Sequence, residues 1–335
     1  MLSSKRTWVS LLGAVLIGLL TLTLAAAPAL GQTKVRIGYL PVISYVPIFV
    51  AVDLGYFKEQ KIEIELLRFA SGSKQMAPLA SGSIDVAAGG ASAGLFNAIA
   101  SGSNFKIVAD KGQNRDGKAY GTQLILSKAV MDRVKAGGLK ALKGETFATF
   151  GKGSVADYGL YHELKHGGLD WSEVRIVNLE PPKTYQALKS GAIVGASTAE
   201  PWSAIVEVEG VGVRYLTAAD IPEIAETQIA VIMYGGDFMT KQRDLAQRWM
   251  DAYIKGIRYY NKTGMMHDTV VKILQNYTKV DSKVLAKAIP VYLDNNGRVN
   301  VKSIQHQIDW NVKVGNLKTP IDARTIVDES FLPKS

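Results

Sequence analysis

The chain has 335 residues, of which 47% are hydrophobic and 21% charged, and it contains no cysteine. At roughly 150 residues per domain, this length predicts about two globular domains, and the composition excludes a disordered, collagenous or multi-span membrane protein. The absence of cysteine excludes disulfides, thiol nucleophiles and thiolate metal sites, and the formal charge of +9 is scattered rather than gathered into a nucleic-acid-binding patch.

Residues 1–31 have the pattern of a secretory signal peptide. Lys5 and Arg6 form a basic head, residues 9–24 are free of charge, and small residues at Ala29 and Gly31 precede the predicted cleavage point. The alternative is an uncleaved membrane anchor, since the apolar run is just long enough to span a bilayer. Because proline and small residues follow the run, instead of a basic stop-transfer flank, we predict cleavage and a periplasmic location.

Short apolar runs then alternate with helical patterns along the rest of the chain. Strands are predicted at 35–40, 62–69, 86–88, 105–109, 123–126, 146–150, 174–179, 194–198, 213–216 and 230–234. Helices are predicted at 45–59, 73–81, 91–100, 155–166, 183–190, 201–209, 241–263, 267–277, 282–288 and 301–314.

This alternation predicts an α/β protein with two lobes, each a mostly parallel sheet flanked by helices. We assign residues 32–125 and 228–335 to lobe 1 and residues 126–227 to lobe 2, because the last helical block is too rich in helix for a third α/β unit. Two crossings between lobes form a hinge, and the cleft between the lobes is the expected ligand site.

Small, hydroxyl and aromatic residues follow the predicted strands, at the edge where open α/β sheets bind ligands. Glycines let a ligand approach the backbone, and aromatic rings supply flat apolar walls. Tight strand-to-helix turns alone also explain such residues, so that alternative stays open. The loop residues are Tyr39, Pro41, Ser44, Tyr45, Ser71–Ser73, Gly89–Ser92, Gly151–Ser154, Tyr158 and Glu200–Trp202.

Several of these loops carry a family resemblance. The run Ile37–Pro41, followed by Tyr45–Pro47 and Ala51–Phe57, resembles the opening of nitrate/sulfonate/taurine-type periplasmic binding proteins. These are the substrate-capturing subunits of ABC importers, and thiamine-pyrimidine binders share the same broad family. Further similar motifs are Phe69–Gly72, Leu79–Val86, Gly89–Ser92, Leu142–Gly144, Ala187–Gly191 and Glu200–Trp202.

The resemblance implies a type II periplasmic-binding-protein fold that closes on its ligand and docks on an inner-membrane permease powered by a cytoplasmic ATPase. It implies no chemical reaction, so we expect no catalytic residue, cofactor or metal, no nucleic-acid partner, and a monomer. Residues 41–45 lack the Asn and His expected of the thiamine-pyrimidine branch, which disfavours a pyrimidine. The implied ligand-binding residues are Tyr39, Tyr45, Ser71, Gly90, Ser92, Ser154, Tyr158, Glu200 and Trp202.

Aromatic residues around the cleft favour an organic solute over a small inorganic anion, and Lys152 is the only cation that the pattern places nearby. A sulfonate, a carboxylate or a planar heterocycle such as a pyrimidine or flavin remains possible. Glu200 either pairs with a ligand ammonium or caps a helix. We expect Trp202→Ala and Ser92→Ala each to weaken ligand binding, with little change in the melting temperature of the empty protein.

Two other functions compete with solute import. His162, Glu163 and His166 spell H-E-x-x-H, the zinc-hydrolase pattern, in which two His on one helix face bind the metal. Gly167 and Gly168 end that helix at once, and no third ligand is compelling, although Glu180 and Glu200 are available. The other candidate is a sensor domain that presents its ligand to a membrane receptor.

Overall fold

The computed structural model describes residues 32–115, 121 and 123–334. Contacts within the chain divide it into two units, Met1–Thr33 and Lys34–Ser335, and of the first only Gln32 and Thr33 are described. The predicted signal peptide at residues 1–31 therefore lies outside the described residues. In the described ranges, no helix combines the length and the apolar character needed to cross a bilayer.

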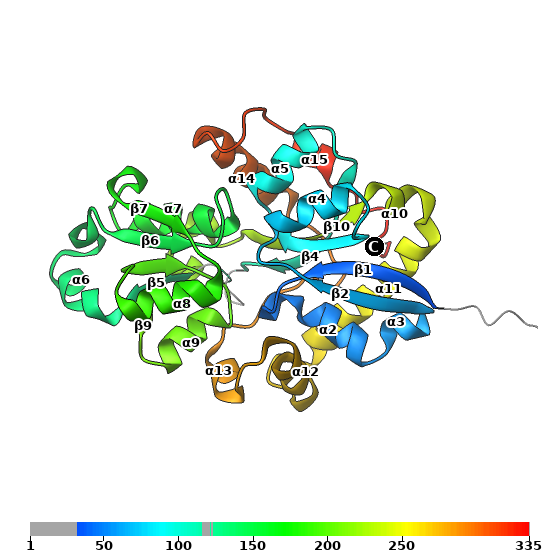
Figure 1. The fold of residues 1–335 in the computed structure, drawn as a ribbon, viewed down its shortest axis with the longest axis horizontal. Coiled ribbons are helices and arrows are strands. Elements are labelled where there is room, and N and C mark those ends of the chain that lie inside the picture. Colours follow the sequence, from blue (N-terminus) through cyan, green and yellow to red (C-terminus); the bar gives the residue numbers. More distant parts are fainter. Residues whose placement is uncertain (1–31, 116–120, 122, 335) are drawn as a thin grey trace, which may run out of the picture. The chain divides into compact units, whose positions relative to one another are not determined.

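In the part of the chain that the structure describes, ten strands form two five-stranded sheets (Figure 1). The first sheet has the order β2-β1-β3-β10-β4 and contains β1 (Thr33–Tyr39), β2 (Ile62–Arg68), β3 (Val86–Gly90), β4 (Phe105–Gln113) and β10 (Gln228–Gly235). The second sheet has the order β7-β6-β8-β5-β9 and contains β5 (Gln123–Ser127), β6 (Thr146–Thr149), β7 (Arg175–Asn178), β8 (Gly195–Ser197) and β9 (Gly212–Thr217).

Both sheets are mixed in the same way. In the first, β1 and β3 are parallel, whereas β10 runs antiparallel to both of its neighbours. In the second, β6 is parallel to β7 and β8, whereas β5 runs antiparallel to both of its neighbours. The antiparallel strand in each case is one that follows a crossing of the chain from the other sheet.

Helices cover both faces of each sheet. Those that pack with the first sheet are α2 (Val46–Asp53), α3 (Tyr56–Glu59), α4 (Met76–Ala80), α5 (Ala93–Ala100), α10 (Gly236–Lys241), α11 (Arg243–Thr263), α12 (Asp268–Thr278), α13 (Ser282–Lys287), α14 (Val301–Lys313) and α15 (Ala323–Ile326). Those that pack with the second are α6 (Met131–Gly137), α7 (Val155–His166), α8 (Pro181–Ser190) and α9 (Trp202–Val208). Short 3-10 helices lie at η1 (Ile43–Tyr45), η2 (Ser73–Gln75), η3 (Lys128–Val130), η4 (Leu139–Leu142), η5 (Trp171–Glu173), η6 (Ala218–Asp220) and η7 (Pro222–Ile224).

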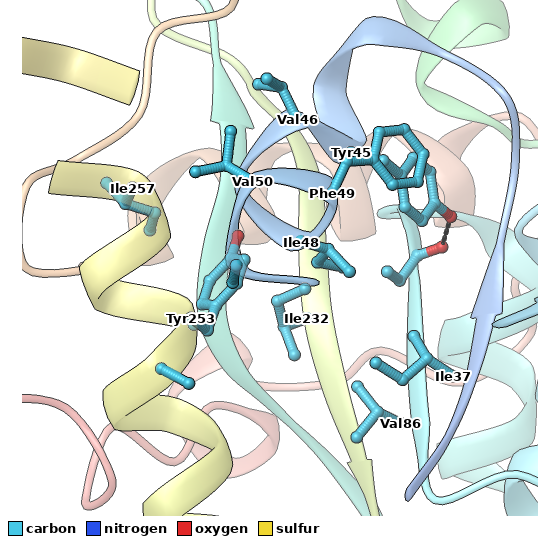
Figure 2. Close-up of a cluster of buried hydrophobic side chains, with 14 of the residues drawn as sticks. Ile37, Tyr45, Val46, Ile48, Phe49, Val50, Val86, Ile232, Tyr253 and Ile257 are labelled. Carbon is cyan, nitrogen blue, oxygen red and sulfur yellow. Dashed lines mark hydrogen bonds between the residues drawn. The ribbon is translucent and has the colours of Figure 1, made fainter. Parts of the chain in front are cut away.

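The central strands of the first sheet are buried on both faces, so their side chains alternate between two cores. In β10, Ile232 and Tyr234 join the core under α2 and α11, whereas Val231 and Met233 join the core under α4, α5 and α14. Figure 2 shows the first of these cores, with α2 residues such as Ile48 between the sheet and α11.

Two predicted elements differ from the structure in ways that bear on the site. The helix predicted at 45–59 is broken into η1, α2 and α3, because Gly55 takes a left-handed conformation at φ 77° between the two α-helices. The strand predicted to end at Ala109 continues through Asp110 and Lys111 to Gln113, since β10 pairs along its full length. This extension brings Lys111 into the first sheet.

Candidate functional site

A cavity of about 70 Å³, here called the inner chamber, lies between residues of the two sheets. Its walls combine backbone of small residues with aliphatic and aromatic side chains, and Lys111 is the charged residue in its lining. From the first sheet and its loops the lining residues are Leu40, Val42, Ser44, Tyr45, Ala70, Gly72, Gly89, Gly90, Lys111, Ile229 and Ala230. From the second sheet and its loops they are Phe150, Val155, Pro181 and Ala199.

A second cavity of about 290 Å³, the outer chamber, adjoins the first and shares four lining residues with it, Leu40, Val42, Ala70 and Pro181. Its other residues are Pro41, Arg68, Phe69, Glu180, Pro182 and Trp202. Together the chambers reach the lower end of the size range of small-molecule sites, roughly 300–1,000 Å³. The charged residues of the outer chamber, Arg68 and Glu180, are exposed.

Direct contacts join the two sheets beside these chambers. The backbone N–H of Ala93 donates to the carbonyl of Gly153 at 2.9 Å, and that of Ile43 donates to the carbonyl of Glu200 at 3.2 Å. Gly153 has a φ of +66°, and a Cβ there would lie 2.4 Å from the Cβ of Ala93. A glycine is therefore required where the loop before α7 meets the start of α5.

Tyr45 anchors the wall of the inner chamber that η1 supplies. Its hydroxyl donates to the carbonyl of Ala88, drawn as a dashed line in Figure 2, and its ring stacks on Phe49 with the centroids 6.0 Å apart. Gln75 fixes the same strand, since its side chain bonds both the carbonyl and the N–H of Ala88. Burial raises the pKa of the Tyr45 hydroxyl, so the ring stays neutral.

Lys111 lies against Tyr45 and is only 1% exposed. Its Nζ donates to Ser44 Oγ at 2.7 Å and lies 3.8 Å from the centroid of the Tyr45 ring. Burial lowers the pKa of Lys111 to about 7, and the charge of Asp110 offsets part of that effect.

The predicted site residues do not all reach the chambers. Tyr45 and Gly90 line the inner chamber and Trp202 the outer one. Ser71 lies between the lining residues Ala70 and Gly72, and Tyr39 packs edge-on against Tyr45 behind the wall.

Three other predicted residues cap helices or pack in a core beside the chambers and line neither of them. Ser92 and Ser154 are buried helix N-caps, which accept hydrogen bonds from Leu95 N and Asp157 N respectively. Tyr158 packs edge-on against Trp310 in a separate core, and burial there raises its pKa to about 12.

Glu200 is buried, and protein donors engage both of its carboxylate oxygens. Its Oε1 accepts hydrogen bonds from Arg214 Nη2 at 2.9 Å, Gln123 Nε2 at 3.2 Å and Ile289 N at 3.1 Å. Its Oε2 accepts one from Ala204 N at 3.2 Å, in the first turn of α9. Burial raises the pKa of Glu200, and the guanidinium of Arg214 opposes that shift. The carboxylate thus caps a helix and ties three segments together.

The H-E-x-x-H segment occupies most of the last two turns of α7. Glu163 is fully buried beside Ser197, His166 is exposed, and His162 packs edge-on against Tyr158. Burial lowers the pKa of His162 to about 4. Across the described ranges, no group of three His, Asp or Glu side chains is placed to hold a metal ion. No geometry here supports the zinc-hydrolase alternative.

The lysine that lines the inner chamber is Lys111, not the predicted Lys152. Lys152 is exposed and is absent from both linings, whereas Lys111 lines the inner chamber. The signal was present in the Asp110-Lys111-Gly112 run, where two charged residues continue an otherwise apolar strand. The contributions of Phe150, Pro181 and Ile229 to the lining had no such signal.

Comparisons with known proteins identify the family of the chain and relatives that share its fold. A model of the NMT1-like family matches residues 28–275. A protein of Bacillus subtilis (strain 168), provisionally named as an aliphatic sulfonates-binding protein, is 23% identical over 314 residues, which are 90% of this chain and 88% of that protein.

Solved structures with the same fold include binding components of import systems. A ligand-binding component of an ABC-type import system from Staphylococcus aureus, solved with zinc bound, matches with a TM-score of 0.74 at 22% identity, over 90% of this chain and 98% of that one. The alkanesulfonate-binding protein SsuA from Xanthomonas axonopodis pv. citri, bound to MOPS, matches with a TM-score of 0.72 at 19% identity, over 91% and 99%. The predicted periplasmic-binding-protein fold and family resemblance are confirmed.

Proposed function

The chain belongs to the NMT1-like family, and from that premise we propose that it is the solute-binding subunit of an ABC-type importer. It captures a small organic solute between its two lobes and delivers it, unaltered, to an inner-membrane permease with a cytoplasmic ATPase. We propose lobe boundaries at 32–125 with 228–335 and at 126–227, a cleaved signal peptide, and a periplasmic monomer.

The main support for this proposal is that residues of both sheets line the two chambers. A ligand held there contacts both lobes at once, so it favours the arrangement in which the lobes are together. The chain crosses between the sheets twice, from β4 to β5 and from β9 to β10, which is the connection that a hinge requires.

The walls favour an organic solute. Leu40, Val42, Phe150 and Pro181 are apolar, and Trp202 offers a flat ring at the outer chamber. Relatives named for sulfonate binding fit this character. A sulfonate, a carboxylate or a planar heterocycle is proposed as the solute class. Because Glu200 already bonds Arg214, we do not assign it to a ligand ammonium.

The test is a thermal-shift screen of the purified protein against sulfonates, carboxylates, nitrate, bicarbonate, pyrimidines and flavins, followed by titration of the best solute. Trp202→Ala removes the flat wall of the outer chamber, and we expect binding to weaken about tenfold, as for a buried aromatic anchor. Trp171→Ala is the matched control, because Trp171 is also half-buried but packs on Tyr161 away from the chambers. Equal affinity of the Trp202→Ala protein and the parent would contradict the proposed site.

A further inference from the structure

Lys111 is the extra residue of a β-bulge. On β10, Val231 pairs with Asp110 and the next residue, Ala230, pairs with Gly112, so Lys111 has no partner opposite it. Gly112 has a φ of +145°, and a Cβ at that position would lie 2.8 Å from Val291. Bulges of this kind redirect a side chain, and they occur often beside functional sites. The bulge accounts for how a lysine in β4, an edge strand of the first sheet, comes to line the inner chamber.

Among the described residues, Lys111 forms no ion pair, and the polar partner of its Nζ is the neutral hydroxyl of Ser44. The charge of Asp110 acts on Lys111 only from beyond ion-pair distance. The neighbouring Asp110 directs its carboxylate elsewhere, since it accepts hydrogen bonds from Gly112 N, Gln228 Nε2 and Asp294 N. The described lining of the inner chamber contains no acidic residue either.

A buried cation without a counter-charge is costly for a folded protein. Proteins normally pair such a group, and an unpaired one in a ligand cavity is suited to an anion that arrives with the ligand. The Tyr45 ring and the Ser44 hydroxyl stabilise the ammonium only in part. Because burial lowers the pKa of Lys111 to about 7, an anion bound beside its Nζ would favour the charged form of the side chain.

We infer that Lys111 determines specificity by binding the anionic head of the solute, so that the ligand is a small organic monoanion with a carboxylate or sulfonate head. This inference rests on the proposed function and narrows it, because neutral pyrimidines and flavins no longer qualify. The head occupies the inner chamber, whose volume of about 70 Å³ admits a small group only. The apolar remainder of the solute lies in the outer chamber beside Trp202.

Calorimetric titration of the purified protein with matched series tests this inference. The probes are alkanesulfonates and alkanoates of two to eight carbons, benzenesulfonate and benzoate, and the corresponding neutral sulfonamides and amides. We expect the parent to bind anions of these series and to discriminate against their neutral counterparts. Lys111→Met keeps the length of the side chain without its charge, and we expect anion affinity to fall at least ~30-fold, as when one partner of a buried charge pair is removed.

Lys152→Met is the matched control, because Lys152 is exposed and lies in neither lining; its affinity should equal that of the parent. The empty Lys111→Met protein should melt at or above the parent temperature, since an uncompensated buried charge is removed. A lysine with a purely structural role would give the opposite shift. If Lys111→Met does not fold, Ser44→Ala replaces it, with the same direction of effect on anion affinity.

The outcomes separate this inference from the proposed function. Equal binding of anions by Lys111→Met and the parent overturns the role of Lys111, as does equal binding of neutral and anionic probes by the parent. If only neutral heterocycles bind, and Trp202→Ala weakens them, the inference fails while the proposed function stands. If no probe binds in a way that depends on Trp202, both fail.

Discussion

Lys111 and Glu200 are two buried charged side chains near the chambers, and they differ in the number and charge of their polar partners. Glu200 is engaged by four protein donors, among them the guanidinium of Arg214. Lys111 has a hydroxyl and an aromatic ring beside it, and it forms no ion pair with any residue that the structure describes. A complete set of partners is typical of a structural group, whereas an incomplete set leaves capacity for a ligand.

The structural role of Glu200 predicts a large effect on stability. Glu200→Ala removes the more deeply buried of the two carboxylates that pair with Arg214, leaves only Glu207, and removes the acceptor of the N–H of Ala204 in the first turn of α9. Because several buried donors lose their acceptor, we expect the free energy of unfolding in urea to fall by roughly 2–3 kcal/mol. Asp132→Ala is the control, because its pair with Lys135 is exposed and is worth less than about 1 kcal/mol. A loss at Glu200 as small as that at Asp132 would show that the network is not structural.

Partners distant in sequence explain why residue roles were the least predictable feature. The sequence left open whether Glu200 contacts a ligand or caps a helix. Its partners Gln123, Arg214 and Ile289 come from three separate segments, which no local pattern connects. Lys111 was missed because a bulge, which depends on the register between β4 and β10, decides where it points. Neither register nor bulge has a clear signature in one sequence.

Helices and strands were far more predictable than the roles of single residues, because hydrophobic periodicity is a local property of the sequence. The helix predicted at 155–166 is α7 (Val155–His166), and Ser154 caps it, as a serine before an apolar-periodic segment predicts. Residues 131–137 form α6 although no helix was predicted there. The break at Gly55 was also missed, since the apolar pattern continues across it and only the left-handed glycine interrupts the helix.

The structure gives Ser92 a different role from the one that the sequence predicted. The sequence suggested a ligand contact whose loss leaves stability intact, whereas the structure uses Ser92 Oγ to cap α5 through Leu95 N. We now expect Ser92→Ala to lower the free energy of unfolding by about 1 kcal/mol, the usual value of an N-cap. Ser83→Ala, an exposed serine outside any cap, should change it by less than about 0.5 kcal/mol. Weaker solute binding at unchanged stability would instead support the original expectation.

For the unit Lys34–Ser335 as a whole, sequence predicted two α/β sets but not the surfaces that they share. The proposed lobe boundary at 125/126 falls inside β5 of the second sheet, and the one at 227/228 lies directly before β10 of the first. The contacts of Ala93 with Gly153 and of Ile43 with Glu200 follow from three-dimensional docking of the sets, which composition and periodicity do not encode. The chambers are therefore visible only in the structure.

A disulfide placed across the inner chamber tests the central claim, that the two halves must part and close around the solute. A Cβ built on Gly90 lies 3.8 Å from the Cβ of Val155, on the other side of the chamber. That separation suits a disulfide, whose Cβ atoms average about 3.8 Å apart, and the chain has no cysteine of its own to interfere.

The measurement is the rate of solute uptake by the Gly90→Cys/Val155→Cys protein before and after reduction, followed by stopped-flow fluorescence. Reduction leaves both side chains in place, so it changes only the link between the halves. Because an oxidised protein held together rarely reaches a binding-competent open state, we expect uptake at least about tenfold slower than in the reduced protein. Equal rates in the two forms would contradict a site that opens and closes between the sheets.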